Sequence, residues 1–538
     1  MIHFQRQFSK KTKLALSLAT AVMLSLGWCG ASCISLFVAF VPLMLISAQY
    51  GSSWRDTFSM LGWATLSFAL WNVFTIWWVW IATPIGPIVA TIVSTWWNLV
   101  AFMLFHVVSK SAPKGVAYVL FIAAWISTEY IYINAPAMSF PWLVLGNGFA
   151  NDVWAVQWYE YTGVLGGSLW VLLVNVLALQ SLLTMRKRVW VATTLSLVVP
   201  MVVSLVLYNL YRPQGKRYDS LDKVRVTVVQ PNVPCYEKFN TEREWQQRNI
   251  LSLLEEADSI SRAEGGAAEF ILLPETSLAE MSHTGPLVMS NMMSRLARFL
   301  RLRNPGAQII AGTETMRYYG QTKGSPTARR RNDGYVDIYN SSVGIDSVEM
   351  IQVHNKGKLV IGVETTPAWL RDAEIFSVDL GGTMGQLGIG DSTEPFLHHN
   401  KRVAPAICYE GLYGEYMGGF VRHGAQLLGV VSNDGWWGNT LGHKYLFAFC
   451  RLRAIECRRD VARSANTGTS GFITMRGDDV ATLGWDKRGS LTADLRLNSE
   501  TTYYVRCGDY IGRIALYIAA LCLLYCMAYA AKKRFYLN

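Results

Sequence analysis

The sequence predicts a polytopic α-helical membrane domain of about eight spans, joined to one large water-facing α/β domain. Two observations predict the membrane domain: hydrophobic residues make up 51% of the chain, and long stretches carry no charge. A third observation, the alternation of short apolar strands with helices after residue 223, predicts the α/β domain. A chain of 538 residues is long enough for both.

Stretches without Asp, Glu, Lys or Arg locate the spans, because about 20 apolar residues are needed to cross the hydrocarbon core. The two longest stretches should each hold two helices, since turn-forming residues divide them at 27–30 and 83–87. A further span is expected at about 115–133, with Glu129 near its end. The charge-free stretches are Leu14–Trp54, Thr57–Ser109, Tyr161–Met185, Val189–Tyr211 and Ile514–Ala531. We therefore expect seven spans before residue 212 and one after residue 510.

Basic residues in alternate connections predict the orientation of these spans. The connections near 30, near 85 and across 134–162 contain no Lys or Arg, so all basic clusters fall on one side, which should be the cytoplasm. The clusters are Arg6 with Lys10, Lys11 and Lys13; Arg55; Lys110 with Lys114; Arg186–Arg188; and Lys532–Arg534. The first span also has the features of a signal peptide, but the parity of the charges favours its retention.

Three parts are expected: a seven-span domain at 1–211, an extracytoplasmic domain at 212–508, and a C-terminal helix with a basic tail at 509–538. The net charge of +11 belongs to the membrane part, since residues 212–531 hold 36 Lys and Arg against 34 Asp and Glu. This balance argues against a nucleic-acid partner. The nine cysteines show no metal-ligand spacing, and the five in the outer domain cannot all pair with one another.

The outer domain alternates between strands and helices, which is typical of a sheet covered by helices. The residues at 317–333 are polar and basic and should form a loop. Strands are expected at 224–229, 270–273, 307–312, 341–345, 349–354, 403–408, 426–432, 471–475 and 503–505, and helices at about 241–263, 286–303 and 442–460.

Three expected strand ends carry reactive side chains: Glu275, Lys356 and Cys408. A carboxylate can take the proton of a thiol, and an ammonium can stabilise both the thiolate and a tetrahedral oxyanion. Taken singly, each residue has a simpler interpretation. Cys408 would be a core side chain, Glu275 a turn or helix-cap residue, and Lys356 a solvated loop charge.

The order of short motifs decides between these interpretations. The sequence resembles the nitrilase superfamily of carbon–nitrogen hydrolases and, with its spans, the apolipoprotein N-acyltransferase family of the bacterial inner membrane. The motifs are Phe140–Leu143, Gln230–Asn232, Leu273–Thr276, Tyr339–Ser342, His354–Lys356, Leu359 with Val360 and Glu364, Ile407–Glu410, Ser432–Gly438, Arg463–Gly468 and Gly508 with Asp509. The resemblance implies an αββα sandwich with a Glu275–Lys356–Cys408 triad and no cofactor or metal.

The resemblance also implies a two-step reaction. Glu275 would act as general base and acid, Cys408 as the nucleophile, and Lys356 with the backbone N–H of Tyr409 as oxyanion donors. A fatty chain would pass from a phospholipid to Cys408, and then to the N-terminal amine of a diacylated apolipoprotein. The protein is expected to be a monomer. The general base should have a pKa near neutral, raised by a partly apolar pocket.

Supporting roles are implied for further residues. Glu364 and Glu410 should orient Lys356 or Glu275. The aromatic Trp142 suits the membrane interface, where it anchors the chain or contacts substrate. Three departures from the family pattern weaken the assignment of the surrounding loops: His354 stands where Tyr is usual, Ile361–Val363 replace Pro-Phe-Gly, and Phe239 replaces an aromatic residue that is often Trp.

Two other functions fit parts of the sequence. A membrane-tethered amidase would use the same triad with water as the acceptor, but hydrolysis of a soluble amide needs no bilayer. A transporter or channel would need charged residues within its spans, and these spans contain only Glu129. An acyltransferase is therefore the prediction.

Overall fold

The computed structural model describes residues 7–30, 33–136, 138–236, 242–278, 280–283, 290–331, 334–365 and 386–535. The chain divides into two compact units. The helical unit comprises Met1–Ala135, Ser139–Tyr208 and Cys507–Asn538, and the α/β unit comprises Pro136–Met138 and Asn209–Arg506.

The helical unit contains six described helices that are long and apolar enough to cross a membrane. They correspond to six of the eight expected spans. The first two expected spans are shorter: α1 has 17 residues, and the next segment is a 3₁₀ turn followed by α2, which begins at Val41 with Pro42 in its first turn. The helices are α1 (Lys10–Leu26), η1 (Cys33–Val38), α2 (Val41–Ala48), α3 (Trp54–Ile76), α4 (Val79–Ala82), α5 (Gly86–Ser111), α6 (Lys114–Asn134), η2 (Pro141–Leu143), η3 (Leu145–Phe149), η4 (Val153–Ala155), α7 (Tyr159–Thr184), α8 (Lys187–Leu210) and α15 (Tyr510–Phe535).

The α/β unit is built on two sheets. The first has the order β14-β1-β2-β4-β6-β5, with β3 paired to β4 and β7 paired to β6. The second has the order β13-β12-β11-β10-β9-β8. The strands are β1 (Asp222–Gln230), β2 (Phe270–Leu272), β3 (Met281–His283), β4 (Gln308–Gly320), β5 (Arg329–Arg331), β6 (Gly334–Ile345), β7 (Ile351–Asn355), β8 (Phe396–His398), β9 (Lys401–Ile407), β10 (Leu427–Ser432), β11 (Val461–Ala465), β12 (Ser470–Ile473), β13 (Asp479–Leu483) and β14 (Gly489–Leu497).

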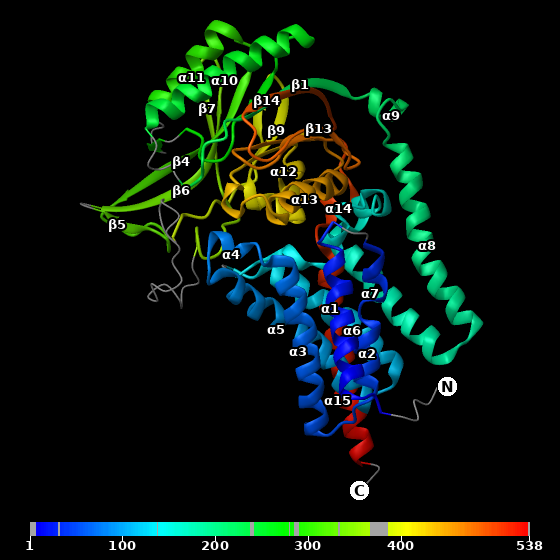
Figure 1. Cartoon of the computed structure of the whole chain (residues 1–538). Helices are drawn as coiled ribbons and strands as arrows, with labels where there is room; N and C mark the ends of the chain where they lie inside the picture. Colours follow the sequence, from blue (N-terminus) through cyan, green and yellow to red (C-terminus); the bar gives the residue numbers. More distant parts are fainter. Residues whose placement is uncertain are drawn as a thin grey trace. The chain divides into compact units, whose positions relative to one another are not determined.

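Helices cover the outer face of each sheet (Figure 1). Buried side chains of α10 and α11 form one core with β1, β2, β4 and β6, and those of α12 and α13 form another with β9, β10 and β11. The inner faces of the sheets meet, and the Ser464 hydroxyl on β11 donates to the Val229 carbonyl on β1 at 2.7 Å. The helices and 3₁₀ turns of this unit are α9 (Lys216–Asp219), α10 (Arg243–Glu264), α11 (Asn291–Arg303), η7 (Cys408–Leu412), α12 (Gly414–Arg422), η8 (Gly435–Trp437), α13 (Leu441–Cys457) and α14 (Tyr503–Cys507). The predicted αββα sandwich is confirmed.

Two local predictions are wrong. The loop expected at 317–333 is partly strand, because β4 continues to Gly320 and pairs with β6, and β5 adds a third strand. The strand expected at 503–505 is the short helix α14, whose first turn is held by the Thr502 hydroxyl accepting from the Val505 N–H at 3.1 Å. In the first case strand pairing, and in the second a local side-chain hydrogen bond, outweighs the preference of the residues themselves.

Candidate active site

The reactive residues follow the carboxyl ends of three strands in the two facing sheets. Glu275 comes after β2, Lys356 directly after β7, and Cys408 directly after β9. All three side chains are buried, with Lys356 only 1% exposed. Catalytic groups commonly sit at such positions, since the strand fixes the backbone while the following loop is free to vary.

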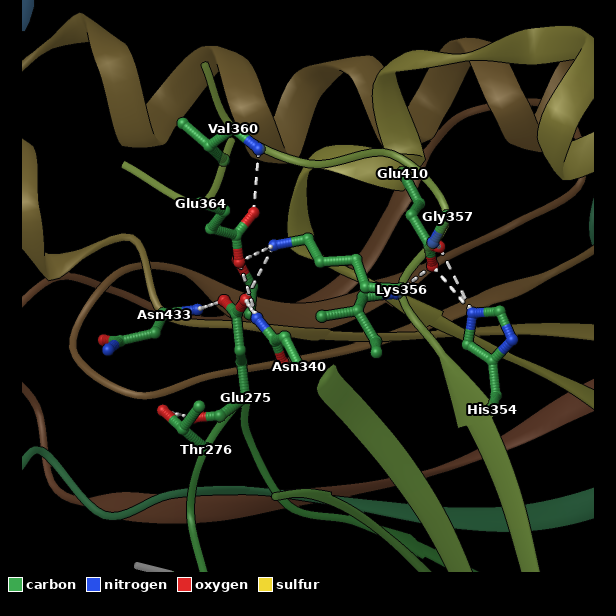
Figure 2. A network of polar contacts seen from close by, with 12 residues as sticks. Glu275, Thr276, Asn340, His354, Lys356, Gly357, Val360, Glu364, Glu410 and Asn433 are labelled. Carbon is green, nitrogen blue, oxygen red and sulfur yellow. Dashed lines mark hydrogen bonds and ion pairs between the residues drawn. The ribbon is translucent and has the colours of Figure 1, made fainter. Parts of the chain in front are cut away.

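Lys356 lies between two carboxylates (Figure 2). Its Nζ is 2.9 Å from Glu275 Oε1 and 2.9 Å from Glu364 Oε1. Buried charges are stable only when they are paired and hydrogen-bonded. The two carboxylates therefore hold Lys356 as an ammonium at this point.

The same carboxylates receive hydrogen bonds from amide groups. Asn340 Nδ2 on β6 donates to Glu275 Oε1 at 2.7 Å and to Glu364 Oε1 at 2.8 Å. Backbone N–H groups take the other oxygens, Asn433 to Glu275 Oε2 at 2.9 Å and Val360 to Glu364 Oε2 at 2.8 Å. The role of Asn340 was not anticipated from the sequence, although it lies within one of the motifs that carry the resemblance.

Backbone geometry holds Glu275 and Cys408 in place. Gly312 on β4 runs against the Glu275 turn so closely that an added Cβ would lie 2.4 Å from Glu275 Cα. Cys408 has φ +48°, in the left-handed region that non-glycine residues adopt at an energetic cost. This conformation ends β9 abruptly and starts the turn η7, so the thiol stands at a sharp strand-to-turn corner.

The pKa directions define the resting protonation state. Burial raises the pKa of Glu275, but Lys356 and Asn340 lower it by a larger amount. The pKa of this carboxyl group therefore lies below its ordinary range. The expectation of a raised, near-neutral pKa for this base is therefore wrong, because an ion pair outweighs desolvation. Burial and the Glu275 charge raise the pKa of the Cys408 thiol. Burial lowers the pKa of Lys356, but both carboxylates raise it above its usual value. At neutral pH the site thus holds a carboxylate, an ammonium and a protonated thiol.

A third buried carboxylate, Glu410, has partners other than Lys356. Its two oxygens accept from the backbone N–H groups of Gly357 and Ile407, each at 2.7 Å. The Tyr416 hydroxyl donates to Oε1 at 2.8 Å. His354 Nε2 lies 3.1 Å from Oε2, as Figure 2 shows. Burial raises the pKa of Glu410, but these partners lower it overall. Glu410 therefore ties together the chain segments that carry Lys356 and Cys408.

Comparison with known proteins identifies the family. A family model described as carbon–nitrogen hydrolase matches residues 225–504, and one described as apolipoprotein N-acyltransferase N-terminal domain matches residues 20–177. The apolipoprotein N-acyltransferase of Chlorobaculum tepidum is 30% identical over 506 residues, which cover 90% of either chain. The chain belongs to the apolipoprotein N-acyltransferase family. It is an acyltransferase with a carbon–nitrogen hydrolase domain and membrane-spanning helices.

Other relatives are more distant. The apolipoprotein N-acyltransferase of Pasteurella multocida is 27% identical, with 77% of this chain and 74% of the relative covered. Among solved structures, an amidase from Nesterenkonia sp. is 18% identical with a TM-score of 0.36, and the match covers 54% of this chain and 95% of the amidase.

Three further residues were predicted to support the active site of this apolipoprotein N-acyltransferase family member. Tyr409 is buried in η7, with its ring 5.6 Å from that of Tyr413. Trp142 belongs to the helical unit, where it is buried and its carbonyl accepts from Trp28 Nε1 at 3.0 Å. Phe239 lies outside the described residues.

The loop that carries Trp142 is anchored by Glu129, the single acidic residue expected within the spans. Glu129 Oε1 accepts from the Leu145 N–H at 2.9 Å and from Trp125 Nε1 at 3.0 Å. Glu129 therefore fixes the start of the segment that follows Trp142 against α6. Within the described ranges, no group of three or more His, Cys, Asp or Glu side chains is placed to hold a metal ion.

Proposed function

We propose that this chain transfers a fatty acyl group from a phospholipid to the N-terminal α-amine of the diacylglyceryl-cysteine of an apolipoprotein, through a thioester on Cys408. Family membership supports the reaction class. The observation that carries the residue assignment is the buried pair of Glu275 and Lys356 at 2.9 Å, whose charges both act on the pKa of the Cys408 thiol.

In the first half-reaction, Cys408 Sγ attacks the ester carbonyl as its proton passes to Glu275. The resting carboxylate and thiol are the correct starting forms for such a coupled transfer. Lys356 stabilises the oxyanion, together with the backbone N–H of Tyr409, whose role rests on the family resemblance. The C–O bond then breaks, and Glu275 returns the proton to the departing lysophospholipid.

In the second half-reaction, the lipoprotein amine attacks the thioester carbonyl and loses a proton to Glu275. Collapse of the oxyanion breaks the C–S bond, and the Cys408 thiolate recovers the proton from Glu275. The lysine ammonium is needed in both halves, because negative charge develops twice on the same oxygen. Glu364 and Glu275 hold that ammonium between them, and Glu410 fixes the backbone next to Lys356 and next to Cys408.

The proposed setting is the bacterial inner membrane, with residues 212–508 on the periplasmic side. The distribution of basic residues between the expected spans supports this orientation. Both substrates are lipids, so a membrane-embedded monomer meets donor and acceptor in the same bilayer. The domain boundaries at 211 and 509 and the absence of a nucleic-acid partner belong to the same proposal.

The test is a two-step mass measurement on the purified, detergent-solubilised chain. Incubation with a labelled phospholipid should add one fatty acyl group to the peptide that contains Cys408. A diacylated lipopeptide should then remove this group and gain it. Cys408→Ala and Cys408→Ser should stay folded but carry no acyl group.

Two results would contradict the proposal. Full turnover by Cys408→Ala would remove the nucleophile assignment. Release of free fatty acid, with no acylated lipopeptide, would show that water is the acceptor and that the chain is a hydrolase.

A further inference from the structure

A buried polar network lies behind Cys408, on the neighbouring strands β10 and β11. The parallel register pairs Ile407 with Val431. Cys408, directly after β9, therefore lies beside Ser432, the last residue of β10. The side chains of Ser432, Arg463 and Asp434 are all fully buried. None of them has a part in the mechanism above.

The chemistry of the side chains decides which group donates and which accepts in each hydrogen bond of this network. Arg463 Nη2 lies 3.0 Å from Ser432 Oγ and 3.1 Å from Asp434 Oδ2, and Nη1 donates to the Thr469 carbonyl at 2.5 Å. A guanidinium has only donors, so Ser432 Oγ is the acceptor in its contact with Arg463. The single hydroxyl proton of Ser432 then points away from Arg463, and the strand register places Cys408 on the neighbouring strand end to receive it.

We infer that Ser432 is a further catalytic residue, which donates a hydrogen bond to Cys408 Sγ in both half-reactions and is oriented by Arg463 and Asp434. This inference rests on the proposed function, since it concerns the same thiol. Burial and the Glu275 carboxylate raise the pKa of that thiol, whereas Lys356 and the Ser432 hydroxyl act in the opposite direction.

The contribution of Ser432 differs from that of Lys356. In the first half-reaction the Cys408 proton goes to Glu275, the S–C bond forms, and negative charge moves from sulfur to the carbonyl oxygen beside Lys356. In the second, the C–S bond breaks and the charge returns to sulfur. A donor on sulfur therefore stabilises the nucleophile before attack and the leaving group afterwards. Donation from a cationic guanidinium strengthens the hydroxyl as a donor.

Asp434 explains how the arginine can be buried at this position. An unpaired guanidinium in a dry interior would be strongly destabilising, and the carboxylate supplies the balancing charge. Gly468 permits the approach, because a Cβ there would lie 2.3 Å from the Asp434 carboxyl group. The motifs around residues 432–434 and 463–468 thus meet in one structure behind the thiol.

The experiment compares Ser432→Ala, Ser432→Thr and Ser470→Ala. Ser470 is a matched control, because its hydroxyl is also buried, accepts from the Ala465 N–H at 2.9 Å and donates to Gln230 Oε1 at 2.6 Å. The first readout is the pH dependence of Cys408 alkylation by iodoacetamide, followed by the mass of the peptide containing Cys408. The second is the rate of thioester formation and aminolysis.

Ser432→Ala should shift the alkylation profile to higher pH by about one unit and slow both half-reactions about 10- to 100-fold. Ser432→Thr retains the hydroxyl and should recover most of the loss, and Ser470→Ala should leave the profile unchanged. A folded Ser432→Ala protein with the profile and rates of the unmodified chain would overturn the inference. Alkylation needs neither lipid nor lipopeptide, so a failure to form any thioester would refute the proposed function while the alkylation profiles still decide the role of Ser432.

Discussion

Two buried carboxylates support the triad in different ways. Glu364 contacts the Lys356 ammonium at 2.9 Å, whereas Glu410 binds two backbone N–H groups, a tyrosine hydroxyl and a histidine. The sequence suggested one shared role, orienting Lys356 or Glu275. The structure separates them: Glu364 balances the charge of the site, and Glu410 fixes the position of the segments that carry it.

The difference shows why one active site contains three glutamates. A carboxylate that faces an ammonium changes the proton affinity of its neighbours, so its loss should alter the chemistry and its pH dependence. A carboxylate that faces backbone N–H groups holds loops together, so its loss should alter stability and alignment. Variants at each position separate these effects.

The largest effect is expected at the triad. Lys356→Ala leaves Glu275 and Glu364 buried without their cation, and Glu275→Gln removes the base, so either change should slow thioester formation about 1,000-fold or more. The mass of the acyl-enzyme after incubation with labelled phospholipid measures this. Residual rates within tenfold of the unmodified chain would contradict the assignment.

Glu364→Gln tests the charge-balancing side. Glutamine keeps an acceptor for Lys356 but removes the charge, so turnover should fall about 10- to 100-fold while the protein stays folded. Initial rates of lipopeptide acylation, beside a thermal unfolding curve, give the comparison. An unchanged rate would show that one carboxylate is sufficient for Lys356.

Glu410→Gln tests the positioning side. Because breaking this fully buried set of contacts costs about 3 kcal/mol, a lower unfolding temperature should accompany about a tenfold loss of rate. The folded pKa of Glu410 is depressed, so its stabilisation is complete above the ordinary carboxyl pKa of about 4.3 and is lost as the pH falls through the folded value. The variant should lack this acid-dependent loss, which unfolding curves at several pH values detect.

Asn340→Ala should move the acid limb of the activity profile. Asn340 helps to keep the pKa of Glu275 below the ordinary carboxyl range, so activity should persist to a pH below that range. Without this donor the pKa rises, and the acid limb should shift to higher pH by about one unit, with about a tenfold lower rate. A pH–rate profile with an unmoved acid limb would contradict this role.

The smallest effect is expected at Lys358. Its ammonium lies 4.9 Å from the centre of the Tyr413 ring, away from the contacts of Lys356. Lys358→Ala should retain activity within about twofold, because a cation–π contact contributes little at a partly exposed site. A loss as large as that of Lys356→Ala would contradict the assignment of Lys356, rather than Lys358, as the lysine that stabilises the oxyanion.

The sequence was informative wherever a local pattern determines structure. Apolar runs located β1, β2, β9 and β10, and the strand-end positions of Glu275 and Cys408 followed from them. The strands β3, β5, β8, β11, β13 and β14 were not predicted. β13 has exposed positions and an irregular register with β12, so its sequence lacks a clear apolar pattern.

The predictions about the site that failed depend on contacts between distant segments. The lowered pKa of Glu275 requires Lys356 and Asn340, which lie 81 and 65 residues away in the chain. The division of labour between Glu364 and Glu410 likewise depends on which partners the fold brings to each. The spacing of residues in the sequence does not determine these contacts. The pKa of Glu275 and the separate roles of Glu364 and Glu410 therefore follow only from the three-dimensional structure.

The close passage of Gly312 beside the Glu275 turn has a consequence for mutational scanning. An alanine at Gly312 would push against the backbone of Glu275 and Thr276, and relieving this contact would displace the general base relative to β4. A saturation library selected for lipoprotein acylation should therefore reject substitutions at 312 as firmly as those at the triad. A residue without a functional group would score as essential, and its cause would be steric rather than chemical.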